Sequence, residues 1–154
     1  MDTQPLIEVE TTIDDKYAKE EDLKIEIHQK INKIDSLETL NKTKDELEDR
    51  FGILDENIII YMYEELFYKE LRNLNIKKVN QTKNFISIIL SKELTKNIDG
   101  ELLFLDVISL TRKFRFSMKN EELTITLDTV SLDKHFIYYL IEMVDILKKA
   151  IKSG

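Results

Sequence analysis

The chain has 154 residues and a formal net charge of −7, with 42% hydrophobic residues, 34% charged residues and no cysteine. This length suits one ordinary domain, and the small number of glycines and prolines favours a globular chain rich in helices and strands. The negative charge argues against a general polyanion binder, and the absence of cysteine excludes disulfides and thiolate metal sites. No apolar run reaches the ~20 residues that a bilayer requires, and the first residues lack the features of a secretory signal, so we expect a cytoplasmic protein without membrane contact.

The first half of the chain predicts an extended arm followed by three helices. Residues 1–18 are expected to form the arm, and residues 19–154 a single domain. Apolar residues at intervals of three and four predict helices over residues 20–33, 36–51 and 55–74. Asp35 precedes Glu38 by three residues, as in a capping box, and Gly52 supplies a stop for the second helix.

The second half predicts two hairpins and two further helices. Short runs with β-branched residues or period-two alternation predict strands over residues 76–80, 84–90, 112–118 and 123–128. Helices are predicted over residues 101–110 and 132–152. The expected fold class is α+β, with N-terminal helices, a mainly antiparallel sheet built from the two hairpins, and a C-terminal helix.

Acidic residues gather where the second predicted helix ends, which calls for an explanation. Glu46, Glu48 and Asp49 lie near a helix C-terminus, where the helix dipole disfavours negative charge. Arg50 could pair with Glu46 at the i,i+4 spacing, but this leaves Asp49 unexplained. Arg50 is also one of four arginines against nineteen lysines, which is suggestive of bidentate recognition by its planar guanidinium group. These residues therefore form a candidate face for a partner.

Other patterns give little support for chemistry. No phosphate-binding glycine loop is present, and neither His28 nor His135 has a metal-ligand spacing, so we expect no catalytic residue, no metal and no cofactor. The segment with Arg112, Lys113 and Arg115 interleaves basic residues with phenylalanines, as some nucleic-acid-binding strands do. Phe114, Phe116 and Met118 share one face of that strand, most simply the core face. A nucleic-acid-binding module that uses this basic patch remains an alternative function.

Two stretches resemble a known family, the C-terminal module of the bacterial transcription-repair coupling factor, Mfd. They are KIEIHQKI, residues 24–31, and TKDELEDRFGILDENI, residues 43–58. The second is similar to the family pattern ELxDRFGxLP, which is matched at Glu46, Leu47, Asp49, Arg50, Phe51, Gly52 and Leu54. Asp55 stands where the family usually has proline, and His28 where it commonly has tyrosine. The similarity extends over about residues 13–151.

The resemblance implies a regulatory module without enzymatic activity, within an ATP-driven DNA translocase that removes stalled RNA polymerase and recruits nucleotide excision repair. In the family, this module folds against the UvrB-homology module of the same polypeptide and covers the surface that binds UvrA. The resemblance assigns partner binding to Glu46, Asp49 and Arg50, and a structural role to Phe51 and Gly52. It implies no direct contact with nucleic acid, and contact with UvrA and RNA polymerase only through the full protein.

Overall fold

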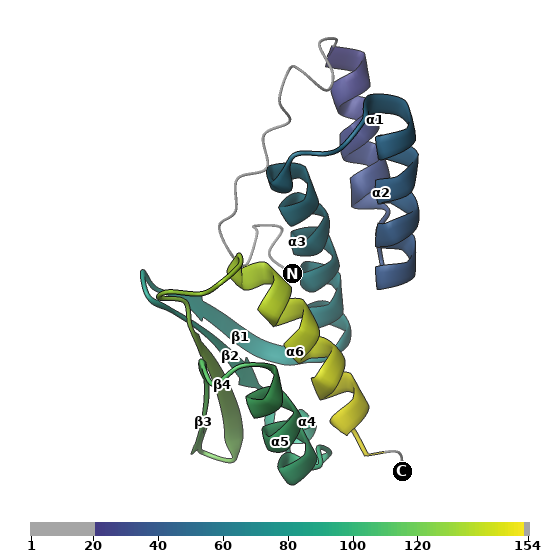
Figure 1. Cartoon of the computed structure of the whole chain (residues 1–154). Coiled ribbons are helices and arrows are strands. Elements are labelled where there is room, and N and C mark those ends of the chain that lie inside the picture. Colours follow the sequence, from purple (N-terminus) through teal and green to yellow (C-terminus); the bar gives the residue numbers. More distant parts are fainter. Residues whose placement is uncertain (1–20, 153–154) are drawn as a thin grey trace. The chain divides into compact units, whose positions relative to one another are not determined.

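A computed structural model describes residues 21–152 of the chain (Figure 1). Its contacts divide the chain into two compact units, with the boundary after Lys69, inside the third helix. We call the described residues 21–69 the helical unit and residues 70–152 the sheet unit. The arm predicted over residues 1–18 lies outside the described residues.

The helical unit is built on α1, Glu21–Asn32, α2, Leu37–Phe51, and most of α3, Glu56–Asn73. Its core includes the apolar residues that the helical spacing singles out, namely Ile27, Ile31, Ile34, Leu40 and Leu47, each at most 2% exposed. The end of α1 is also tied to α3, because the Lys69 ammonium donates hydrogen bonds to the carbonyl oxygens of Asn32 and Ile34. The three predicted helices are thus present, with boundaries within about two residues of those expected.

The ends of α2 differ in part from the sequence prediction. Ser36, and not Asp35, is the N-cap, and its hydroxyl accepts a hydrogen bond from the Thr39 backbone N–H at 3.0 Å. The Thr39 hydroxyl in turn accepts from the Ser36 N–H at 3.0 Å, so threonine takes the place expected for Glu38 in the capping box. At the other end, Gly52 has φ 83° and ψ −171°, a region that essentially only glycine occupies.

The sheet unit contains one four-stranded antiparallel sheet. Its elements are β1, Ile76–Gln81, β2, Phe85–Leu90, α4, Lys92–Lys96, α5, Gly100–Leu110, β3, Phe114–Lys119, β4, Glu122–Asp128, and α6, Phe136–Ala150. The strand order is β1-β2-β4-β3, so the two predicted hairpins pair through β2 and β4 into one sheet. The expected α+β fold class is confirmed.

One face of the sheet is buried beneath helices, and α5 and α6 can be followed along it in Figure 1. This face carries Ile86 and Ile88 from β2, Ile125 and Leu127 from β4, and Phe114 from β3, all at most 2% exposed. The next residues on the same strands point to the opposite face, since side chains alternate along a strand. Among the described residues, β1 and β3 form the two edges of the sheet.

Three details of the sheet unit depart from the sequence prediction. The one-turn helix α4 was not predicted, because five residues are too few to show a helical period. The last helix begins at Phe136 and not at Leu132, after a loop in which Ser131 has φ 59°. Met118 shares the core-side face of β3 but is 61% exposed, so it is not part of the buried core.

Candidate interaction surface

The candidate partner-binding residues lie on α2, and two of them are engaged with α1. The Arg50 guanidinium donates two hydrogen bonds to the Glu26 carboxylate, at 2.8 and 3.4 Å. One turn earlier, the Lys30 ammonium lies 3.3 Å from the Glu46 carboxylate. The i,i+4 pair between Glu46 and Arg50 considered from the sequence is therefore replaced by two ion pairs between helices.

The Arg50–Glu26 pair is bidentate, which is the geometry that the rare arginine suggests. The hydrogen bond from Arg50 lowers the pKa of the Glu26 carboxyl below its usual value, and the charges of Arg50 and Lys30 act in the same direction. The same contact raises the pKa of Arg50. Both side chains are 41% exposed, so solvent screens the pair and its main effect is to fix how α2 lies against α1.

Glu48 stabilises the turn that follows α2. Its carboxylate accepts a hydrogen bond from the Leu54 backbone N–H at 3.5 Å, and its carbonyl oxygen accepts one from the Gly52 N–H at 2.9 Å. The turn after the helix is thus held by Glu48 from both its side chain and its backbone. Phe51, the last residue of α2, is half-buried and lies beneath the Arg50 guanidinium, 5.0 Å from ring centroid to Cζ.

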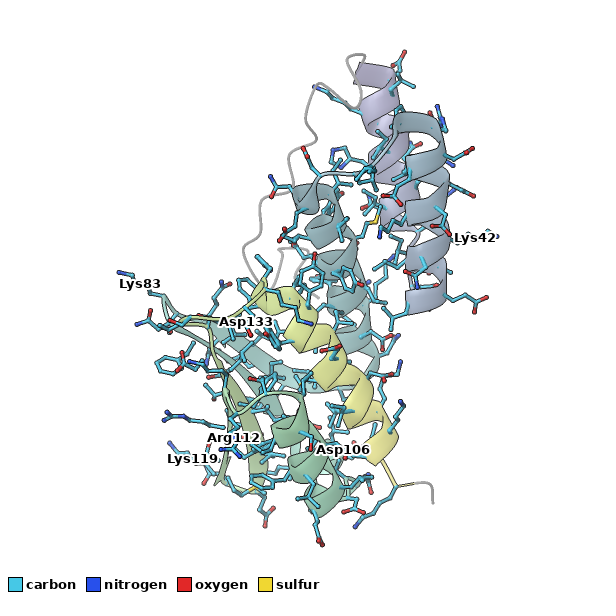
Figure 2. The ribbon with its side chains drawn as sticks, in the orientation of Figure 1. Lys42, Lys83, Asp106, Arg112, Lys119 and Asp133 are labelled. Atoms are coloured by element: carbon cyan, nitrogen blue, oxygen red, sulfur yellow. The ribbon has the colours of Figure 1, made fainter. Side chains whose placement is uncertain are left out.

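Asp49 is exposed on the side of α2 that faces away from the core. It follows the buried Leu47 by two residues, which places it about 200° around the helix from the core side. Asp45 and Asp49 are both exposed and form no ion pair with any described residue. Lys42, one turn before Asp45, also projects away from α1 in Figure 2. The outer face of α2 therefore offers two free carboxylates on a rigid helix, with Glu46 at its margin.

An exposed isoleucine follows α2, and sequence reasoning missed it. Ile53 directly follows Gly52 and is 86% exposed, while its neighbour Leu54 is 6% exposed. Ile53 lies in the turn between α2 and α3, so it belongs to no helical period that would predict its exposure. The only sequence signal is an isoleucine directly after the glycine that ends a helix. We call the three acids Asp45, Glu46 and Asp49 of α2 the acidic face.

Both histidine side chains form hydrogen bonds within the protein. The His28 ring nitrogen Nδ1 lies 2.9 Å from the Tyr61 hydroxyl, which also donates to the Asn32 side chain at 3.2 Å. His135 is the N-cap of α6, and its Nδ1 accepts a hydrogen bond from the Ile137 N–H at 3.1 Å. No group of three or more His, Asp or Glu residues within residues 21–152 is arranged to hold a metal ion.

The two phenylalanines of the basic segment at β3 are buried or half-buried. Phe114 is 2% exposed, and Phe116 packs against Phe104 of α5 with ring centroids 5.3 Å apart. The Lys113 ammonium donates to the Val130 carbonyl oxygen at 3.0 Å, which leaves Arg112 and Arg115 as the exposed cations of the predicted patch. None of the described helices combines the length and apolar character needed to span a bilayer.

The sequence that forms these helices is similar to that of known proteins. A family model described as the TRCF domain matches residues 7–101, which include the whole of α2 and the acidic face. The transcription-repair-coupling factors of Staphylococcus aureus (strain USA300) and Staphylococcus epidermidis (strain ATCC 35984) are 32% and 33% identical to the chain over 129 residues. The alignment covers 80% of this chain and 11% of each relative.

A crystal structure of the C-terminal domain of a transcription-repair coupling factor has the same fold. It superposes with a TM-score of 0.79 at 21% identity and covers 95% of this chain and 91% of that one. Because the family model matches more than half of the sequence, the chain belongs to the TRCF domain family. The resemblance in residues 24–31 and 43–58 is thereby confirmed. The chain spans about a ninth of the length of the curated relatives that it matches.

Proposed function

We propose that the chain is a non-catalytic regulatory module of a transcription-repair coupling factor and that its acidic face docks on the UvrB-homology module of the same polypeptide. Docking covers the surface through which that module binds UvrA, and release uncovers it. Contact with UvrA and RNA polymerase occurs through the full protein. The observation that carries the proposal is that Asp45 and Asp49 are exposed, unpaired among the described residues and held on one side of a rigid helix.

The negative charge of the acidic face favours a partner surface of positive charge. Carboxylates on a surface steer a basic partner and set its orientation more than they add affinity, which suits a contact that must open. Arg50 does not need to reach the partner, since its guanidinium is already bound to Glu26. Its role in the proposal is to position α2, and the partner's arginines face Glu46 and Asp49.

Charge reversal of Glu46 and Asp49 to lysine tests the proposal. The variant is expected to lose binding to the separately produced UvrB-homology module in titration calorimetry and, within the full-length protein, to capture more UvrA. A matched control reverses Asp106 and Asp133, which are exposed acids of the sheet unit labelled in Figure 2. Wild-type binding by the α2 variant, or equal loss in the control, contradicts docking through the acidic face.

Stability separates a docking defect from misfolding. Asp49→Lys removes no contact with a described residue and places a favourable positive charge near a helix C-terminus, so it is expected to change stability by less than about 0.5 kcal/mol. Asp49→Lys alone tests docking more specifically than the double variant, because Glu46→Lys also breaks the ion pair with Lys30. A normal thermal transition together with lost binding supports the proposal.

A further inference from the structure

The outer edge of β3 has main-chain groups that no described residue satisfies. The Asp128 N–H donates to the Lys113 carbonyl oxygen at 2.9 Å, so residues 113 and 128 form a hydrogen-bonded pair between β3 and β4. Such pairs alternate along an antiparallel ladder, which makes Arg115 and Ser117 the next residues bonded to β4. The N–H and C=O groups of Phe114, Phe116 and Met118 therefore point away from β4, toward the open edge.

The two edges of the sheet are not equivalent. On β1 the register shifts between Ile76 and Lys78, and such an irregularity disrupts pairing along an edge. On β3 the register runs without interruption from Phe114 to Lys119. A regular, open edge of this kind is able to accept an additional strand.

Side chains at the β3 edge differ between the two faces of the sheet. On the helix side, Phe116, Met118 and Phe104 form an apolar strip in which Met118 is 61% and Phe104 47% exposed. On the other side, Arg115 and Lys119 are exposed and form no ion pair with a described residue. Arg112 precedes the strand, and Figure 2 shows Arg112 and Lys119 on the side of the unit where β3 runs. Residues 111–120 contain four basic and no acidic residues, in a chain whose net charge is −7.

We propose that the β3 edge binds an extended peptide segment in which acidic residues alternate with apolar ones, and that this segment pairs antiparallel with β3. Its main-chain groups bond those of Phe116 and its neighbours. Its apolar side chains lie beside Met118 and Phe104, and its acidic side chains lie beside Arg115 and Lys119. Pairing of two copies of β3 is disfavoured by the same charges, because cross-strand neighbours would bring cations together.

The geometry fixes which backbone groups of the peptide are required. Directly opposed residues in a sheet have their side chains on the same face, so the peptide residues that bond Phe116 and Met118 are the apolar ones. The N–H groups of the acidic residues point outward, away from β3. A peptide in which glutamate alternates with valine is thus expected to bind when its glutamates are N-methylated and to fail when its valines are.

Titration of the 154-residue chain with this peptide, followed by amide NMR, tests the proposal. Binding is expected to shift and protect the amides of Phe116 and Met118, while Arg115 and Ser117 keep the protection that β4 gives them. Absence of binding, or binding that survives N-methylation of valine, overturns the proposal. So does tighter binding of a single-stranded oligonucleotide that displaces the peptide, since a basic nucleic-acid site would then explain the charges.

Charge variants provide the second arm of the test. Arg115→Glu with Lys119→Glu is expected to weaken peptide binding about tenfold. Lys78→Glu with Lys83→Glu changes net charge equally in the β1–β2 hairpin and is expected to leave the Kd within about twofold. Equal weakening in both variants means that only overall charge matters and contradicts a site at β3. Unchanged NMR spectra outside the mutated strand establish that the variants are folded.

Discussion

Replacing Glu64 by glutamine is expected to flatten the pH dependence of the free energy of unfolding between about pH 5 and about pH 8. Glu64 lies on α3, is 8% exposed, and its Oε2 atom has no hydrogen-bond partner among the described residues. Burial, with a smaller contribution from the charge of Glu65, raises the pKa of Glu64 from 4.5 to about 7. The folded protein therefore holds this proton more tightly than the unfolded chain.

The sign and size of the effect follow from this difference. Below about pH 4.5 the carboxyl is protonated in both states, so it has no effect on stability. As pH rises toward 7 and above, the folded state must either keep the proton or bury a charge, so stability falls. The difference between 4.5 and about 7 corresponds to roughly 3 kcal/mol, since one pKa unit is worth about 1.4 kcal/mol.

Urea unfolding of wild type and Glu64→Gln at several pH values measures this directly. The variant is expected to gain stability relative to wild type as pH rises, approaching about 3 kcal/mol at the upper end of the range. Glu38→Gln, at an exposed position of α2, makes the same chemical change without burial. If the free energies of unfolding of Glu64→Gln and Glu38→Gln both depend on pH as that of wild type does, burial of Glu64 does not control its pKa.

Four further changes test the helical unit. Gly52→Ala is expected to lower the free energy of unfolding in urea by about 1–3 kcal/mol, because residues with a side chain avoid a φ of 83° with a ψ of −171°. No atom obstructs the added Cβ, so the cost is backbone strain, and Gly52→Asn is expected to be destabilised as well. Phe67→Ala, at a residue 1% exposed, is expected to cost ~3–5 kcal/mol, and an unchanged denaturation midpoint contradicts its enclosure. Ser36→Ala is expected to lower stability by about 1 kcal/mol in the same assay, whereas Ser36→Asp should keep the cap. Arg50→Ala is expected to raise the pKa of Glu26 toward its usual value in an NMR titration; a pKa that does not move refutes the bidentate pair.

Local sequence patterns predicted the secondary structure well where the pattern extends over several periods. The three N-terminal helices and both hairpins were predicted because their apolar residues repeat at periods that only one type of backbone satisfies. The predictions failed where the decisive feature is a single contact. Asp35, Ser36 and Glu38 all have side chains suited to a helix N-terminus, and only the backbone conformation selects Ser36 and Thr39 as the capping pair.

The sequence by itself determined the helices, the hairpins, the α+β class and the family resemblance, because each depends on the order of neighbouring residues. Only the tertiary structure decided the partner of Arg50, which is Glu26, 24 positions away, and not Glu46 one turn before it. It also decided that Asp49 stays free and that Glu64 is buried, since both outcomes depend on which elements cover a side chain. Contacts between distant residues arise only when helices and strands pack, and no local pattern records them.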